Sequence, residues 1–113
     1  MKKATLNLYK NNKLYKKYED INVITRKGIN SLIIDDVKTI IGRDRVVREN
    51  AEFRFELDLI NKIATYLLKE KNTLFDIEVE EINYDNNKAR TIVEYKVSSD
   101  QEKTKIELIM NGE

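Results

Sequence analysis

The sequence holds few side chains that could carry out covalent or acid–base catalysis. It contains no Cys and no His among its 113 residues, which excludes thiol nucleophiles, Cys-ligated metal centres and the usual general base near neutral pH. The candidate carboxylate pairs are Asp35-Asp36 and Glu80-Glu81. Carboxylates serve glycosidases and Mg²⁺ or Ca²⁺ sites, but adjacent residues on a strand point to opposite faces of a sheet. We therefore expect no enzymatic activity, no metal site and no cofactor.

Arginines form a second group that could do chemistry, because four of the six lie within twelve residues. A guanidinium group binds carboxylates or phosphates through two parallel hydrogen bonds, so an anion site is one interpretation. Acidic residues alternate with these arginines along the chain, which favours ion pairs between neighbouring strands. The cluster consists of Arg43, Arg45, Arg48 and Arg54.

Charge is distributed unevenly along a chain whose net charge is only +1. Residues 1–18 carry six Lys and no acid, whereas residues 76–113 carry five basic and ten acidic residues. These charges could lie on solvated strand faces, or the first and last strands could be neighbours in a closed sheet. Tyrosines among the first lysines could also stack on nucleic-acid bases, but a near-neutral chain makes nucleic acid an unfavoured partner.

The elements that would position these residues are strands. The chain has 14 Ile, 7 Val and 7 Thr, which fit a pleated sheet, and apolar residues alternate with polar ones over long stretches. We expect a turn at Asn83–Lys88, because Asn and Asp favour tight turns. The predicted strands are 3–10, 14–26, 31–35, 37–42, 46–57, 62–69, 73–82, 89–98 and 103–110.

Residues 57–70 have two interpretations. Apolar residues recur at helical spacing from Leu57 to Leu68, and Asp58 could be an N-cap, as in an amphipathic helix of about three turns. That helix, at about 58–70, would make the fold α+β. In the alternative, residues 53–58 and 63–69 form a hairpin around a turn at 59–62.

Length and composition are those of one globular domain spanning residues 1–113. No apolar run approaches the roughly 7–15 residues of a signal peptide or the 20 of a membrane helix. We therefore expect a cytoplasmic protein that does not enter membranes.

Four stretches of the sequence resemble the YwiB-like family of small bacterial proteins of uncharacterised function. They cover about residues 33–110: Ile33–Arg43, Phe53–Tyr66, Leu74–Val79, and Ile92–Val97 with Ile106–Ile109. The resemblance implies a calycin-type (lipocalin-like) β-barrel, and with it the hairpin over residues 57–70. The family has no known active-site residues to carry over.

The predicted fold is accordingly all-β, an antiparallel and mostly up-and-down meander that closes into a small barrel. A barrel of about eight strands is filled by side chains or holds one small ligand, so we expect a non-enzymatic binding module, with an apolar ligand in its interior. The alternatives are a protein–protein interaction or structural module, as a monomer or homodimer, and weak binding of single-stranded nucleic acid. The candidate ligand-binding residues are Phe53, Phe55, Phe75, Ile77, Tyr95 and Ile106.

Overall fold

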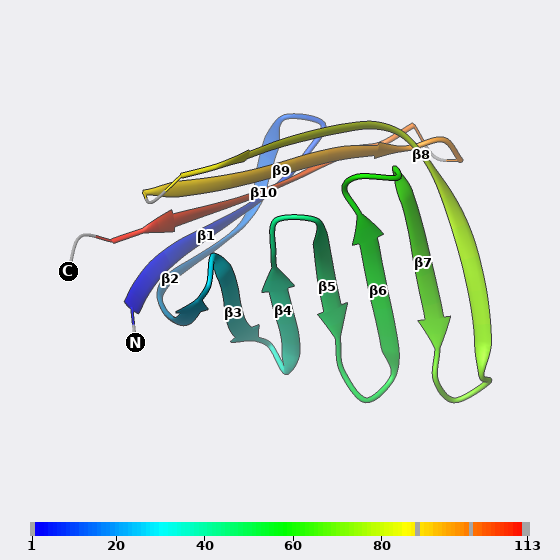
Figure 1. Ribbon diagram of the computed structural model, residues 1–113, viewed down its shortest axis with the longest axis horizontal. Coiled ribbons are helices and arrows are strands. Elements are labelled where there is room, and N and C mark those ends of the chain that lie inside the picture. The colour runs from blue at the N-terminus through cyan, green and yellow to red at the C-terminus, as the bar shows by residue number, and fades with distance from the viewer. Residues whose placement is uncertain (1, 88, 100, 112–113) are drawn as a thin grey trace.

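The computed structural model describes residues 2–87, 89–99 and 101–111 and contains ten β-strands (Figure 1). These residues form no helix, and so none that could cross a membrane. The strands are β1 (Lys2–Lys10), β2 (Lys13–Arg26), β3 (Ile29–Ile34), β4 (Val37–Ile41), β5 (Arg45–Glu49), β6 (Phe53–Asp58), β7 (Ile63–Leu68), β8 (Thr73–Asn86), β9 (Arg90–Val97) and β10 (Lys103–Met110).

The strands pair antiparallel in chain order, and β1 closes the barrel against β10. Figure 1 shows β3 to β7 as one wall, while β9, β10 and β1 form the layer above it. The long strand β8 belongs to both, because it leaves β7 and continues along β9. The predicted all-β barrel is therefore confirmed.

The core consists of the side chains that alternate onto the inner face of each strand. Leu57, for example, is fully buried and stands directly opposite Val46 on β5 and Ala64 on β7. Directly opposed residues share a face of the sheet, so such pairs define rows of inward side chains that run around the barrel. On the other side, Leu6 and Leu108 continue the core across the β1–β10 closure.

The hairpin interpretation of residues 57–70 is confirmed. Strands β6 and β7 pair from Phe53 opposite Leu68 to Asp58 opposite Ile63. The signal for a helix start came from Asp58, whose carboxylate accepts hydrogen bonds from the backbone N–H groups of Ile60 and Asn61 at 3.0 Å. The same side-chain bond that would cap a helix here stabilises the turn.

Two predicted boundaries are wrong. The strand expected at 46–57 is two strands, because Asn50 accepts hydrogen bonds from the N–H groups of Glu52 and Phe53 and so builds a turn. The turn expected at Asn83–Lys88 is largely strand, since β8 continues to Asn86. There the polar side chains have cross-strand partners, such as Thr91 Oγ1, which donates to Asn86 Oδ1 at 2.6 Å. Lys88 lies outside the described residues.

The basic N-terminal strand does lie beside the acidic C-terminal region, as one interpretation of the charge pattern predicted. Strand β1 pairs with β10 over seven residue pairs, and Lys10 forms an ion pair with Glu102 at 3.5 Å. The other recorded ion pairs of these lysines are more local, from Lys16 to Asp35 and from Lys17 to Glu19.

Candidate functional site

Strands β2 and β3 part from each other within the barrel wall. They pair only from Ile24 opposite Ser31 to Arg26 opposite Ile29, although β2 has 14 residues. The remainder of β2 follows β1 through a β-bulge at Glu19 and Asp20, where Asp20 has a φ of 55°. A bulge bends a strand and increases its twist. Among the described residues, no backbone hydrogen bond joins the first part of β2 to the second half of β3.

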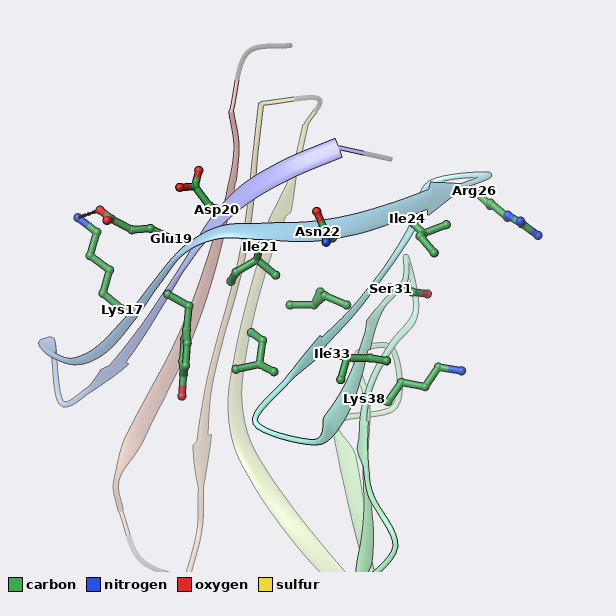
Figure 2. A pocket seen from close by; sticks show the side chains of 13 residues that line it. Lys17, Glu19, Asp20, Ile21, Asn22, Ile24, Arg26, Ser31, Ile33 and Lys38 are labelled. Atoms are coloured by element: carbon green, nitrogen blue, oxygen red, sulfur yellow. Dashed lines mark ion pairs between the residues drawn. The ribbon is translucent and has the colours of Figure 1, made fainter.

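A cleft of about 960 Å³ occupies the space between the two strands; we call it the β2–β3 cleft. Figure 2 shows Ile21 on the β2 side and Ile33 and Lys38 on the opposite side. Leu32 forms its base and is only 3% exposed, whereas Ile33 at the rim is 69% exposed. The lining residues are Lys17, Tyr18, Glu19, Asp20, Ile21, Asn22, Ile24, Arg26, Ser31, Leu32, Ile33, Ile34 and Lys38.

Side-chain contacts to Asp35 bridge the cleft at the end opposite the paired residues. The Tyr18 hydroxyl on β2 donates a hydrogen bond of 2.6 Å to Asp35 Oδ2, in the turn after β3. Lys16 Nζ lies 3.6 Å from the same oxygen. The Tyr18 hydrogen bond, with the Lys16 charge, lowers the pKa of Asp35 below its usual value. The bridge therefore holds an ionised carboxylate at neutral pH, and the cleft is bounded at both ends.

The predicted ligand-binding residues face the barrel interior but do not line this cleft. Phe55 opposes Tyr66, and Tyr66 opposes Phe75, so the three share one inner row. Phe75 is 48% exposed, which shows that its end of the barrel is open rather than an enclosed pocket. Phe53, Ile77 and Tyr95 are half-buried and Ile106 is buried. Phe53 stacks on Tyr66, with ring centres 5.5 Å apart, and Phe55 on Tyr95, at 6.0 Å.

The four clustered arginines do not share one face: Arg45 and Arg54 lie on the outer face of the sheet, Arg48 on its inner face, and Arg43 in the connection between β4 and β5. Arg45 forms ion pairs with Asp44 and Glu56, and Arg54 Nη1 lies 2.9 Å from Glu49 Oε1. These two arginines therefore make the predicted ion pairs.

Within the part of the chain that the structure describes, the other two arginines make no such pair. The Arg43 side chain lies against Gly28, so close that a Cβ there would stand 3.0 Å from Arg43 Nε. Gly28 has a φ of 81°, which favours glycine on backbone grounds as well. Arg48 occupies an inward position, directly opposite Thr39 and Phe55.

A polar cluster covers the outer face of β1 and β10. Glu107 is nearly buried there, and its Oε1 accepts hydrogen bonds from Asn7 Nδ2 at 3.1 Å and from the Tyr9 hydroxyl at 3.0 Å. Arg90 Nη1 lies 3.3 Å from the second carboxylate oxygen. Burial alone would raise the pKa of Glu107, but these hydrogen bonds and the charges of Arg90 and Lys105 lower it below its usual value.

Two other kinds of site were considered, a second cavity and a cluster of acidic residues, and neither suits an apolar ligand as well as the β2–β3 cleft does. A smaller cavity of about 480 Å³ is lined mainly by polar residues, among them Asn30, Asn86 and Asn87. In the part of the chain that the structure describes, no three acidic residues converge in a way that could hold a metal ion.

Comparisons with protein-family models, with curated proteins and with solved structures found no match.

The sequence contained one signal for the β2–β3 cleft. A strand predicted at 14–26 and followed by one at 31–35 cannot be paired along its whole length, so part of the longer strand must have another neighbour or none. The lining residues Ile21, Leu32 and Ile34 fall within these predicted strands, but the pattern of residues along each strand does not show where two strands separate.

Proposed function

We propose that this protein is a non-enzymatic binding module that holds a small apolar ligand in the β2–β3 cleft. The observation that carries the proposal is the size and lining of the cleft. Its volume of about 960 Å³ lies within the range of ligand pockets, about 300–1,000 Å³. The buried Leu32 lies at its base, and its rim has exposed apolar residues such as Ile33 beside charged ones such as Lys38. Sites for small organic molecules combine apolar surface with a few polar groups in this way.

We also propose a fold family and a cellular location for this protein. The antiparallel barrel of consecutive strands agrees with the fold implied by the YwiB-like resemblance, and on that basis we propose a calycin-like bacterial protein. The sequence has no Cys, which agrees with a reducing compartment such as the cytoplasm.

Binding of N-phenyl-1-naphthylamine tests this function directly. The dye is neutral and apolar, and its fluorescence rises in apolar surroundings. The sequence has no Trp, so the dye signal has little protein background. We expect saturable binding to one site, and we expect Ile34→Gln to weaken it about 10-fold, because burial of an Ile side chain contributes about 1.5–3 kcal/mol. Ile33→Gln, at the exposed rim, should weaken it less.

Ile60→Gln serves as the matched control. Ile60 is 72% exposed in the turn between β6 and β7 and does not line the cleft, so this variant should bind the dye like the wild type. Circular dichroism melting of each variant separates loss of the site from loss of the fold. Absence of saturable binding, or equal affinity in all four proteins, would overturn the proposal.

The alternative is a protein interaction module that uses the unpaired edges of β2 and β3. Strand edges accept an added strand through their free N–H and C=O groups, and both edges face the cleft. A concentration-dependent dimer in light scattering, together with no dye binding, would favour this alternative. Nucleic-acid binding by the lysines and tyrosines of the N-terminal hairpin, β1 and β2, would instead appear as an affinity that falls steeply with salt.

A further inference from the structure

The smaller cavity of the barrel has a lining unlike that of the β2–β3 cleft. Its volume is about 480 Å³, and we call it the asparagine cavity. It lies between the β2–β3 hairpin and residues of β1, β8 and β10. Its lining, among the described residues, includes no acid and no residue of the β2–β3 cleft: Lys2, Thr25, Gly28, Asn30, Asn86, Asn87 and Met110.

Three inward positions around this cavity hold polar side chains. Each stands directly opposite a buried residue of the neighbouring strand: Lys2 opposite Val23, Asn30 opposite Ile41, and Asn86 opposite Thr91. Directly opposed residues share a face of the sheet, so the three positions continue the inner rows of the barrel. A protein core favours apolar residues at such positions, so core packing does not account for the polar side chains here.

The asparagines of the cavity use their oxygen atoms within the protein and leave their NH2 groups for a ligand. Each Oδ1 accepts hydrogen bonds: that of Asn30 from Thr25 Oγ1 at 2.7 Å, that of Asn86 from Thr91 Oγ1 at 2.6 Å, and that of Asn87 from two backbone N–H groups at 2.9 Å. None of the three Nδ2 groups has an acceptor among the described residues. Asn30 is only 7% exposed, and a buried donor without an acceptor is costly.

Positive charge accompanies these donors. Lys2 lines the cavity and has no ion pair within the described ranges. The Arg43 side chain lies beside the cavity, because it packs on the lining residue Gly28, where a Cβ would stand 3.0 Å from Arg43 Nε. The asparagine cavity therefore combines three amide donors with a nearby charge of two, and no lining acid opposes them.

We infer that the asparagine cavity binds a small hydrophilic phosphate monoester, whose phosphoryl oxygens accept hydrogen bonds from the Nδ2 groups of Asn30, Asn86 and Asn87. A phosphate monoester carries a charge of about −1.5 to −2 near neutral pH, which the charges of Lys2 and Arg43 balance. This site is additional to the proposed function, because the cavity and the β2–β3 cleft have no lining residue in common.

A phosphoryl group suits this lining better than a carboxylate does. It has three terminal oxygens for the three amide donors, whereas a carboxylate has two oxygens and a single charge. The cavity, at about 480 Å³, is also within the range of small-molecule sites, about 300–1,000 Å³. Its polar lining leaves room for a short hydroxylated group attached to the phosphate.

Titration with three related compounds tests the inference. Glycerol 3-phosphate, glycerate and glycerol share a hydroxylated chain and differ in the charged group, and the ionic strength is kept equal at pH 7.5. Heteronuclear magnetic resonance spectra of the ¹⁵N-labelled protein resolve the asparagine NH2 groups. We expect glycerol 3-phosphate to shift the signals of Asn30, Asn86 and Asn87 in a saturable way. Glycerate should bind about 10-fold more weakly, because it offers fewer charged acceptors, and glycerol should cause no saturable shift.

Asn86→Asp is the most informative substitution. It keeps an oxygen to accept the hydrogen bond from Thr91, but it replaces the NH2 donor by a negative charge that repels the phosphoryl group. We expect it to weaken binding of glycerol 3-phosphate by about 10-fold or more. Asn72→Asp is the matched control, because it makes the same change at an exposed residue between β7 and β8 that does not line the cavity. Its affinity should equal that of the wild type.

Lys2→Gln keeps the test decisive if Asn86→Asp fails to fold. Lys2 is exposed, so its loss should leave the fold intact and weaken binding by about 3-fold, as expected for an exposed ion pair. Circular dichroism melting of each variant verifies the fold. Absence of saturable shifts with glycerol 3-phosphate, equal affinity for glycerate, or wild-type affinity in the folded variants of Asn86 and Lys2 would overturn the inference.

Discussion

Replacing Leu108 by Ala is expected to lower the free energy of unfolding by about 3 kcal/mol. Leu108 is fully buried and stands on β10 between Leu6 of β1 and Thr91 of β9. A Leu→Ala change at such a site removes favourable burial and leaves a cavity, which together amount to about 2–5 kcal/mol. Urea denaturation followed by circular dichroism measures the change.

The control for Leu108→Ala is Ile33→Ala. Ile33 is 69% exposed on the outer face of β3, so its truncation should change the free energy of unfolding by no more than about 0.5 kcal/mol. Equal effects of the two substitutions would mean that the interior around Leu108 is not packed as described.

Glu107→Gln is expected to lower the free energy of unfolding by about 2 kcal/mol at pH 7. The carboxylate is nearly buried and accepts hydrogen bonds from Asn7 and Tyr9 while facing Arg90. Hydrogen bonds to a charged group contribute about 1.5–3 kcal/mol each, and part of this is lost when the neutral amide takes the place of the charge. Thermal or urea denaturation at pH 7 gives the difference.

The pH dependence of the free energy of unfolding distinguishes the contribution of the Glu107 charge from that of the packing of its side chain. Its pKa is lower in the folded protein than its usual value, so the unfolded state takes up protons first as the pH falls. The stabilisation is therefore complete above about pH 5 and is lost as the pH falls through the folded-state pKa. The difference between wild type and Glu107→Gln should shrink over that range. Glu78→Gln, at an exposed position on β8, should show neither effect. A difference that stays constant down to pH 3 would contradict the assignment.

Most of the fold could be predicted from the sequence. The alternation of apolar and polar residues along a strand indicates which of them face inward, and this does not depend on which strands are neighbours in the sheet. The helix interpretation of residues 57–70 shows the limit of this signal. Leu57 and Ala64 recur at helical spacing because they oppose each other across a tight hairpin, and Asp58 accepts backbone hydrogen bonds in either structure. Here the choice between helix and hairpin came from the family resemblance rather than from local residue types.

The candidate site was less predictable, because it depends on register across several strands. The cleft exists where β2 leaves β3 at a bulge, and no residue type marks that position alone. Arg48 looked like its three neighbours in sequence, since acids are interleaved with all of them. Its inward position follows only from its alternation with Val46, which is fully buried two residues earlier on the same strand.

The chain-order pairing of the strands has a consequence for how the protein folds. Nine of the ten pairings join strands that are adjacent in sequence, and only β1 with β10 joins distant ones. Pairing of neighbouring strands is fast. Only the pairing of β1 with β10 must bring distant segments of the chain together, which lowers the entropy of the chain. We therefore expect the closure to be part of the rate-limiting step. Leu108 packs across that closure, so Leu108→Ala should slow refolding in stopped-flow experiments, with a smaller effect on the rate of unfolding.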